Sequence, residues 1–274
     1  MNAETGTVAP AQKFTDLMDP ARAAAFQAAL GYKQDIGTGS VLPPFFHQLY
    51  FWTPLPPDGL GRDGHPKVGG AGLIPDMGLP RRMWAGGRLR FEYPLRAGSP
   101  AEKISVLEKV EQKAGRTGSL GLVTLRHELR QDGRLCLSEW HDLVYREDPD
   151  PAAPKPVPPV ARTDETETRD VSFSSTLLFR YSALTFNGHR IHYDLDYARA
   201  VEGYEGLVVH GPLLAQHLML LAEELMGPLA EFSFRASSPL MHFESAVLCR
   251  KGLDLWVRGP DGRLCMSAVA APKG

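Results

Sequence analysis

The sequence predicts an α+β protein in which two similar units each pack an antiparallel sheet against one helix. Three observations lead to this prediction: a repeated hairpin motif, one long apolar helix followed by a series of short strands, and a proline-rich segment near the middle. A chain of 274 residues can form one large domain or two domains of about 100–150 residues each. The repeat favours two.

The hairpin repeat is the strongest indication of two units. The pentapeptide Asp-Gly-Arg-Leu-Cys occupies residues 132–136 and returns at 261–265, 129 residues later. The surrounding segments 125–137 and 254–266 are also similar. An Asp-Gly pair between alternating apolar residues is typical of a two-residue β-hairpin turn, in which both turn residues need a positive φ. We therefore expect each half of the chain to end in the same hairpin.

A proline-rich stretch divides the two expected units. Residues 148–159 have the sequence DPDPAAPKPVPP, and proline favours an extended chain and cannot donate to a sheet. We predict an N-terminal unit over 1–150, a linker over 151–159 and a C-terminal unit over 160–274. A second irregular stretch, rich in glycine and proline, covers residues 53–80, and its length predicts a functional loop or a lid.

The C-terminal unit contains one clear helix. Pro212 suits the first turn of a helix, and an apolar stripe of four leucines follows it and ends before Gly227. The stripe consists of Leu214, Leu218, Leu221 and Leu225. It predicts a buried central helix. Residues 41–46 resemble residues 209–214 weakly, which indicates a counterpart of the helix start in the N-terminal unit.

Short apolar runs on both sides of this helix predict strands. The runs after the helix cover 232–234, 242–249, 253–258 and 264–269, and one run before it covers 177–183. Consecutive antiparallel strands around one apolar helix would bury the apolar faces of both the sheet and the helix.

Composition and charge exclude several classes of protein. Apolar residues make up 43% and charged residues 23% of the chain, as in globular proteins and unlike disordered ones. A net charge of −2 provides no global field for a nucleic acid. No apolar run reaches about 18 residues and no signal-peptide pattern is visible, so we expect no membrane partner. Three cysteines without metal or redox spacing fit the cytoplasm or an organelle matrix.

Polar side chains are concentrated just before the predicted central helix, in the segment 180–194, RYSALTFNGHRIHYD. The segment supplies four candidate site residues: Asn187, His189, Arg190 and His192. Further along, His210, Gly211 and Pro212 begin the helix. Unpaired N–H groups and the helix dipole at such a start favour an oxygen that develops negative charge. Because proline has no N–H, Gly211 is the expected donor.

The run FNGHRIHYD at 186–194, followed by VVHGPL at 208–213, resembles the hydratase motif of MaoC-like double-hotdog proteins. The subgroup most similar to it contains 3-hydroxyacyl-thioester dehydratase type 2 and itaconyl-CoA and mesaconyl-C4-CoA hydratases. The resemblance extends into the first half through PRRMWAGGRLRF at 80–91.

The resemblance implies a double hotdog fold and a hydro-lyase. Such an enzyme adds water to an enoyl-CoA thioester, or removes it from the 3-hydroxyacyl thioester, with no cofactor beyond the coenzyme A of its substrate. A short branched dicarboxylyl-CoA such as mesaconyl-C4-CoA or itaconyl-CoA is the implied substrate. An acyl-CoA thioester is therefore the expected partner, and a homodimer is compatible with this fold.

The sequence departs from the family pattern at one important position. The pattern has Asp, any residue, Asn, Pro, an aliphatic residue and His; here Asn187 replaces the Asp and His192 matches the His. An amide can orient a water molecule but cannot accept its proton. The hypothesis is that His192 alone acts as general base for hydration and general acid for dehydration. Asn187 would hold the water, and the Gly211 N–H would hold the thioester oxygen.

Candidates for substrate binding come from both halves of the chain. They are His189, Arg190 and His210 in the second half and Arg81, Arg82 and Trp84 in the first. The arginines are expected to bind a coenzyme A phosphate or a second carboxylate. Aligning Pro44 with Gly211 places Ala25 opposite His192. We therefore predict that the N-terminal unit shapes the pocket without catalysing.

Other functions stay open on the sequence alone. The alternatives are a 3-hydroxyacyl-ACP dehydratase, a hotdog thioesterase, and a protein that binds acyl thioesters without catalysis, for which the loss of the acid at Asn187 would be suitable. His189, His192 and Asp194 are a further alternative as metal ligands, but their spacing does not suit one helix face, so we expect no metal. Asp194 and Asp196 are expected to cap the turn that follows them.

Overall fold

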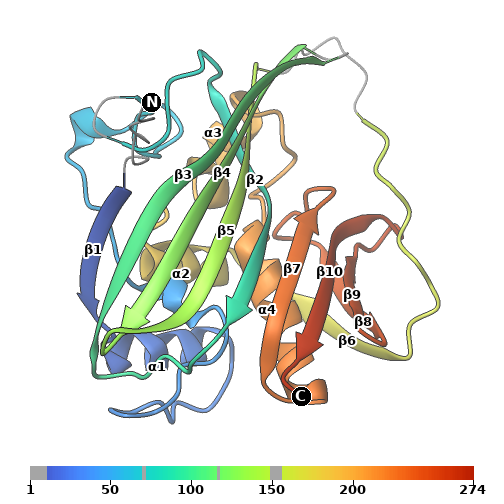
Figure 1. Cartoon of the computed structure of the whole chain (residues 1–274). Helices are drawn as coiled ribbons and strands as arrows, with labels where there is room; N and C mark the ends of the chain where they lie inside the picture. Colours follow the sequence, from blue (N-terminus) through green and yellow to red (C-terminus); the bar gives the residue numbers. More distant parts are fainter. Residues whose placement is uncertain (1–10, 70–71, 116–117, 149–155) are drawn as a thin grey trace, which may run out of the picture.

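The computed structural model of the chain describes residues 11–69, 72–115, 118–148 and 156–274. Within them, ten strands form one antiparallel sheet in the order β1-β3-β4-β5-β2-β7-β10-β9-β8-β6 (Figure 1). The first half supplies β1 (Ala11–Leu17), β2 (Arg81–Phe91), β3 (Pro100–Gly115), β4 (Gly118–Gln131) and β5 (Arg134–Arg146). The second half supplies β6 (Glu167–Ser172), β7 (Leu229–Ala236), β8 (Ser245–Lys251), β9 (Asp254–Arg258) and β10 (Leu264–Pro272).

The helices of the described residues lie mainly on one face of this sheet, behind it in Figure 1. The α-helices are α1 (Pro20–Ala29), α2 (Ser175–Thr185), α3 (Leu195–Ala200) and α4 (Gly211–Met226). The 3-10 helices are η1 (Phe46–Leu49), η2 (Pro57–Gly59) and η3 (Arg190–His192). One antiparallel sheet over a layer of helices confirms the predicted α+β class.

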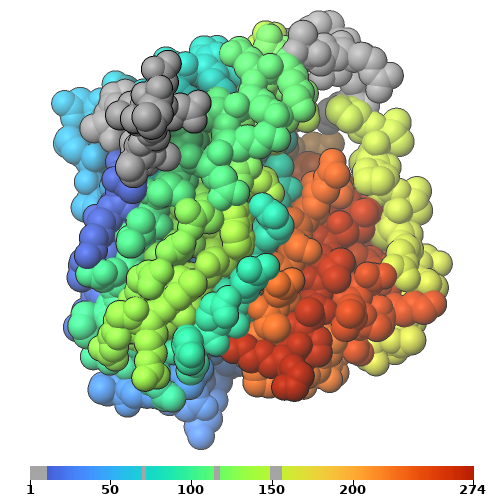
Figure 2. Space-filling view, viewed as in Figure 1, coloured from blue at the N-terminus to red at the C-terminus, as the bar shows by residue number. Residues whose placement is uncertain are grey.

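The two halves of the chain meet in the middle of the sheet, where β2 pairs with β7. In the space-filling view, the strands of the two halves form one surface that is continuous across this pair (Figure 2). Glycine is needed at the junction: a Cβ on Gly86 would lie 2.5 Å from the carbonyl oxygen of Phe234, and one on Gly87 would lie 2.8 Å from that of Trp140. The Gly-Gly pair therefore allows neighbouring strands to approach closely.

The predicted central helix is α4, and it begins at Gly211 with Pro212 in its first turn. Three leucines of the predicted stripe, at 214, 218 and 221, are buried against the sheet. Leu225 is 42% exposed, so the prediction of burial was wrong for this last position. Its place in the final turn carries the side chain past the edge of the core. In the first half, the four-residue helix η1 follows residues 41–45, and no long helix begins there.

The weak similarity between residues 41–46 and 209–214 corresponds to a structural repeat. Val41 bridges to Arg96, and Val208 bridges to Met241 in the same antiparallel manner. The next residue in each half then donates its N–H to a leucine carbonyl 2.8 Å away. The bridges relate the halves by 167 residues, which is the offset that pairs Pro44 with Gly211.

Both predicted hairpins are present, but their turns differ. Between β4 and β5, Asp132 and Gly133 have φ values of 50° and 75°, as a two-residue turn requires. Between β9 and β10, only Gly262 has a positive φ. That loop is longer and is closed by the N–H of Gly259, which donates to the carbonyl of Arg263 at 2.9 Å. The prediction of a two-residue turn was therefore wrong for the second hairpin, because Gly259 and Pro260 lengthen its loop.

The four apolar runs after the central helix lie in strands β7 to β10, although β8 begins only at Ser245. The run at 177–183 was wrongly predicted to be a strand, because it forms α2. Ser174 caps this helix by accepting a hydrogen bond from the N–H of Leu177 at 3.1 Å. Its buried residues are Leu178, Tyr181 and Ser182. That spacing is helical, and the strand before the helix is β6 instead.

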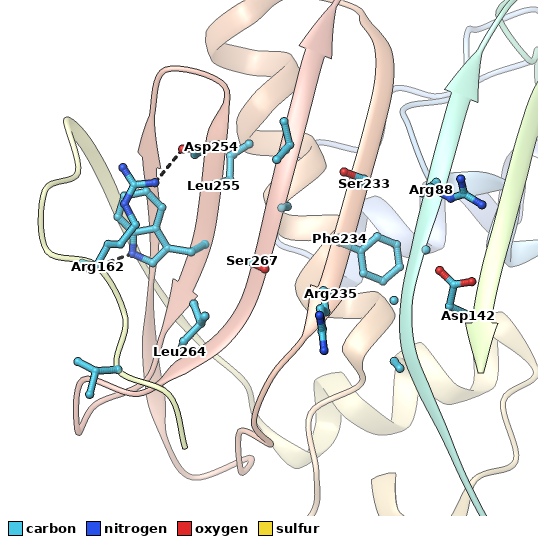
Figure 3. A pocket seen from close by; sticks show the side chains of 17 residues that line it. Arg88, Asp142, Arg162, Ser233, Phe234, Arg235, Asp254, Leu255, Leu264 and Ser267 are labelled. Atoms are coloured by element: carbon cyan, nitrogen blue, oxygen red, sulfur yellow. Dashed lines mark hydrogen bonds and ion pairs between the residues drawn. The ribbon is translucent and has the colours of Figure 1, made fainter. Parts of the chain in front are cut away.

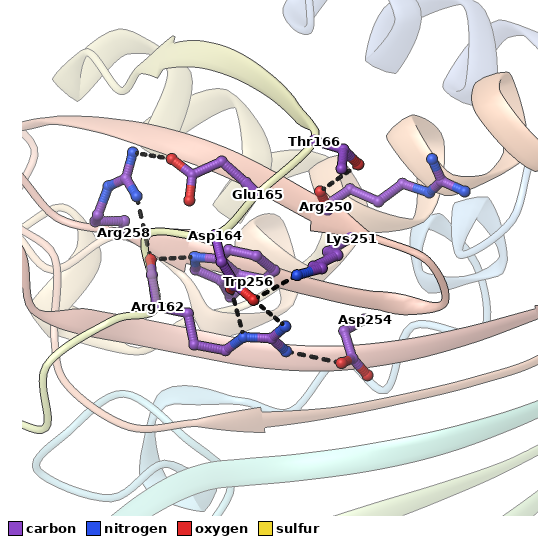
Figure 4. Close-up of polar contacts among 9 residues, drawn as sticks. All are labelled: Arg162, Asp164, Glu165, Thr166, Arg250, Lys251, Asp254, Trp256 and Arg258. Carbon is purple, nitrogen blue, oxygen red and sulfur yellow. Dashed lines mark hydrogen bonds and ion pairs between the residues drawn. The ribbon is translucent and has the colours of Figure 1, made fainter.

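Residues 149–155 of the predicted linker lie outside the described residues, so the division at 151–159 stays a prediction. The chain after them is fastened to β8 and β9 by a charged network (Figure 4). Arg162 donates to Asp164 at 2.9 Å and to Asp254 at 2.7 Å, and Lys251 also donates to Asp164. These groups are about half exposed, so each pair contributes little to stability. No helix in the described residues is long and apolar enough to span a membrane.

Candidate active site

His192 ends helix η3 and is only 7% exposed. Its Nδ1 lies 2.7 Å from the carbonyl oxygen of Val208. Because a carbonyl can only accept a hydrogen bond, Nδ1 carries the proton and Nε2 keeps its lone pair. The residue just before the central helix therefore fixes the imidazole in the tautomer that a general base requires.

His210 lies face to face with His192, with ring centroids 3.6 Å apart and ring planes inclined by 20°. Its Nε2 is 2.8 Å from the hydroxyl oxygen of Ser182 on α2. Its Nδ1 is buried and has no partner among the described residues. If the serine hydroxyl donates to Nε2, Nδ1 carries a proton that a bound ligand can accept.

Gly211 is the first residue of α4, and the preceding His210 provides no side-chain cap. The Gly211 N–H donates to no acceptor in the part of the chain that the structure describes. A Cβ at this position would meet only the carbonyl oxygen of Trp84, at 3.9 Å. The N–H therefore opens on free space beside His210, where the positive end of the helix dipole favours an anionic oxygen.

Asn187 follows the C-terminal residue of α2 and makes a contact that the sequence did not indicate. Its Oδ1 accepts a hydrogen bond from the backbone N–H of His189 at 3.0 Å. Its own N–H donates to the carbonyl of Ser182 at 2.8 Å. Asn187 therefore holds the turn that leads into η3. Its role in orienting water stays a prediction.

The irregular stretch at 53–80 crosses the motif segment directly. The carbonyl of Asp63 accepts a hydrogen bond from the N–H of Arg190 at 2.8 Å. A Cβ on Gly64, which has a φ of 86°, would lie 2.0 Å from the carbonyl oxygen of Gly188. A Cβ on Gly188 would lie 2.5 Å from the carbonyl oxygen of Gly64. Only glycine fits at both positions, so this loop of the first half is in backbone contact with the motif of the second half.

The loop adds two functional side chains that sequence reasoning missed, Asp63 and His65. Nδ1 of His65 lies 3.2 Å from Asp63 Oδ2, and the His65 ring lies 4.5 Å from that of His189. Burial raises the pKa of the Asp63 carboxyl, but hydrogen bonds from His65 outweigh this effect and hold the pKa at about 2. His189 in turn contacts His192 at a centroid distance of 5.4 Å. Only the presence of histidine in a glycine-rich loop signalled this contribution.

The ligand atoms of Asp63, His65 and His189 lie within 4.8 Å of one another, as a metal site would require. The set weighed from the sequence, which included Asp194, is not assembled. Asp194 caps α3 by accepting from the N–H of Tyr197 at 3.0 Å, as expected of it. The positive charge of Arg82 adds to burial in lowering the pKa of both His65 and His189, and it also opposes a cation at this place.

The predicted arginines differ in what already binds them. Arg81 donates to Glu202 at 2.7 Å, and Arg190 donates to Asp194 at 2.7 Å. Arg82 makes no hydrogen bond and no ion pair with any described residue. Trp84 donates its indole N–H to the carbonyl of Gly86 at 2.8 Å. Among the candidate substrate-binding side chains of the first half, Arg82 is therefore free to bind a ligand.

Two cavities are candidates for a ligand site. The larger, of about 600 Å³, lies on the sheet face away from the helices and includes Arg88, Arg235 and Asp142 (Figure 3). None of the motif residues lines it. The second, of about 490 Å³, lies between the 53–80 loop and the ends of β2 and β5 and includes His65 and Arg82. Only the second cavity adjoins the motif.

Acid pH is expected to destabilise the protein, because several imidazoles are buried in the neutral form. Burial lowers the pKa of His192 to about 3, of His189 to about 2 and of His217 to about 4. In the unfolded chain these groups titrate near 6.5, so below pH 6.5 the unfolded state binds more protons than the folded state. The free energy of unfolding should then fall by about 1.4 kcal/mol per pH unit for each such histidine. Urea titrations at pH 7.5, 6.0 and 5.0 measure this effect, and a constant midpoint would contradict it.

The sequence matches a known family along most of its length. The profile of the family described as Hydroxyacyl-thioester dehydratase type 2 matches residues 45–242. A mesaconyl-C(4)-CoA hydratase of Chloroflexus aurantiacus is 47% identical over 238 residues, which cover 84% of this chain and 83% of that protein. This similarity agrees with the resemblance carried by the FNGHRIHYD and VVHGPL runs.

Solved structures with lower identity show the same fold. HtdX of Mycobacterium tuberculosis aligns with a TM-score of 0.68 at 16% identity, covering 95% of this chain and 100% of that one. A second protein of that organism, described as having a double hotdog fold, aligns with a TM-score of 0.59 at 13% identity, covering 96% of this chain and 95% of that one. The predicted double hotdog is thereby confirmed. The chain belongs to the hydroxyacyl-thioester dehydratase type 2 family.

Proposed function

We propose that the protein catalyses the reversible hydration of a short branched dicarboxylyl-CoA, such as mesaconyl-C4-CoA or itaconyl-CoA. Family membership makes the chain a hydro-lyase that acts on acyl thioesters. The observation that carries the proposal is the fixed tautomer of His192, whose free Nε2 lies in a buried site beside the helix start at Gly211. The substrate class follows the 47% identical relative, whose name specifies mesaconyl-C4-CoA.

In this reaction His192 transfers the proton twice. Its Nε2 takes a proton from water while the water oxygen bonds to the β-carbon, and the imidazolium then gives a proton to the α-carbon. Burial lowers the pKa of His192 to about 3, so the imidazole is neutral and able to accept a proton at pH 7. The same burial makes the imidazolium a strong acid, which favours the return of the proton to the substrate.

Charge on the thioester oxygen develops between these two transfers. The Gly211 N–H is the proposed donor to it, an interaction typically worth about 3–4 kcal/mol in the transition state. The unpartnered Nδ1 of His210 is a second donor to the substrate in this arrangement. No cofactor beyond the coenzyme A of the substrate is needed for these steps.

The first half has a supporting role in the proposal. Residues 1–150 would shape the pocket, the 53–80 loop would place His65 beside His189, and residues 160–274 would hold the catalytic groups. A location in the cytoplasm or an organelle matrix and assembly as a homodimer are further expectations of the same proposal.

A panel of thioesters tests the proposed function. Crotonyl-CoA, mesaconyl-C4-CoA, itaconyl-CoA and a 3-hydroxyacyl-ACP would be assayed by the absorbance of the conjugated thioester, with a parallel assay for free thiol. Hydration of mesaconyl-C4-CoA or itaconyl-CoA without thiol release supports the proposal. Thiol release identifies a thioesterase, activity only on the ACP substrate identifies an acyl carrier protein dehydratase, and binding without turnover identifies a binding protein.

Substitutions at Asn187 are expected to separate the value of its acceptor oxygen from that of its amide. Asn187→Asp keeps an oxygen for the His189 N–H and should retain substantial activity. Asn187→Ala removes a hydrogen bond typically worth about 1 kcal/mol and should lower kcat roughly fivefold to tenfold. Initial rates of the two variants on the same enoyl-CoA measure the difference. If Asn187→Ala has wild-type turnover, Asn187 has no role in the site.

A further inference from the structure

The cavity beside the motif contains two polar groups with no partner in the described residues. One is the guanidinium of Arg82 on β2, which neither donates a hydrogen bond nor forms an ion pair. The other is the hydroxyl of Tyr145 on β5, whose side chain is buried with only 3% of the residue exposed. Arg82 and Tyr145 are directly opposite each other in the β2–β5 ladder, so they lie on the same face of the sheet.

The other charged groups of the cavity already have partners. Arg62 pairs with Asp148, and the ammonium of Lys67 donates to a backbone carbonyl at 2.8 Å. The carboxylate of Asp63 is bound by His65, and that of Asp76 accepts from a backbone N–H at 2.9 Å. The hydrogen-bonding capacity that remains consists of donors, the Arg82 guanidinium and the Tyr145 hydroxyl. An unpaired buried donor is costly, so this pair suits an anionic ligand oxygen.

The cavity also lies close to the proposed base. His65 is part of its wall, and its ring is 4.5 Å from that of His189, which is 5.4 Å from that of His192. The cavity wall at His65 is therefore within about 10 Å of His192. The nucleotide phosphates of coenzyme A lie at the far end of the long pantetheine arm, whereas a carboxylate on the acyl group lies beside the reacting carbon. Proximity to His192 favours the acyl carboxylate as the ligand.

We propose that Arg82 and Tyr145 form a carboxylate subsite that selects acyl-CoA substrates with a second carboxylate on the β-carbon. This inference rests on the proposed function and assigns its specificity to two residues. In mesaconyl-C4-CoA the free carboxylate is attached to the carbon that receives the hydroxyl group. The guanidinium of Arg82 would bind this carboxylate through charge-assisted hydrogen bonds, and the hydroxyl of Tyr145 would donate a further one.

A matched pair of substrates tests the subsite. Mesaconyl-C4-CoA and 3-methylcrotonyl-CoA differ only in a carboxylate that replaces a methyl group. Arg82→Met should lower kcat/KM for mesaconyl-C4-CoA about 10- to 100-fold, the usual effect of losing a charged hydrogen bond, and leave 3-methylcrotonyl-CoA within about twofold. Tyr145→Phe should cause a smaller loss, about threefold to tenfold, with the same selectivity. Arg88→Met, an exposed arginine on the same strand, is the control and should change neither substrate.

Binding of saturated analogues tests the subsite without catalysis. The C4 thioester of methylsuccinate and 3-methylbutyryl-CoA again differ only by the carboxylate. Calorimetry should show that the wild-type protein binds the carboxylated analogue at least about tenfold more tightly and that Arg82→Met removes this preference. Equal weakening of both analogues would instead assign Arg82 to a coenzyme A phosphate and overturn the inference, as would a preference that survives in Arg82→Met. A wild-type protein that shows the preference but hydrates nothing would disprove the proposed function and leave the subsite supported.

Discussion

Replacing His192 by alanine is expected to lower kcat for hydration by about 10²–10⁴-fold, the usual contribution of a general acid–base group. The Nε2 lone pair is the base available in the buried site, and its proton is also the one that returns to the α-carbon. Thioester binding should survive, so KM should change much less than kcat. Steady-state rates on mesaconyl-C4-CoA, with the saturated analogue as a binding probe, measure the two effects separately.

A second variant distinguishes loss of the base from loss of structure. His192→Asn retains an N–H that can donate to the carbonyl of Val208, the contact that now positions the ring. It offers no group that can take a proton at neutral pH. His192→Asn should therefore unfold at nearly the wild-type urea concentration and still be as inactive as His192→Ala. Near-normal turnover in either variant would disprove the mechanism.

Glu139→Ala is expected to lower the free energy of unfolding by about 3–5 kcal/mol, the cost of breaking a buried charged group away from its partners. Glu139 is 2% exposed on β5. Nε2 of His47 lies 3.0 Å from one carboxylate oxygen, and Nε2 of His141 and of Gln48 lie 2.9 and 2.8 Å from the other. Burial raises the pKa of Glu139, but the nearby imidazoles outweigh it and hold the pKa well below its usual range. The carboxylate thus keeps its charge in the core.

Urea denaturation of Glu139→Ala at pH 7.5 measures this effect. Glu231→Ala is a suitable control, since Glu231 forms an exposed ion pair with Arg90 at 3.1 Å across β2 and β7. Its loss should cost less than about 1 kcal/mol. If the two variants were equally stable, the buried network would not contribute to the stability of the first half.

The sequence predicted those features that short stretches of chain encode. The repeat, the leucine stripe and the motif around His192 are local, and all three were interpreted correctly at the level of the fold. The run at 177–183 was misassigned because a short apolar segment fits a strand or a helix equally well, and the cap at Ser174 was overlooked. Asp63 and Glu139 were missed for another reason: their partners come from distant segments.

The predicted arginines show the same limit. Arg81, Arg82 and Arg190 are alike in the sequence, and only the fold separates them. Glu202 binds the first and Asp194 binds the last, each through a distance of 2.7 Å. Which arginine is left for a ligand therefore depends on side chains that no local pattern connects to it.

The contrast between the two connections that lead from the helix layer to the sheet has an evolutionary consequence. In the second half, α4 reaches β7 through Gly227 and Pro228 alone, whereas in the first half the whole 53–80 loop lies between η1 and β2. An assembly of identical subunits would have to carry the same connection in every copy. Fusion of two copies in one gene removes that constraint, so one copy could lengthen its connection while the other kept the ancestral short turn. Symmetry was lost, and the lengthened segment became available to serve a neighbour's chemistry.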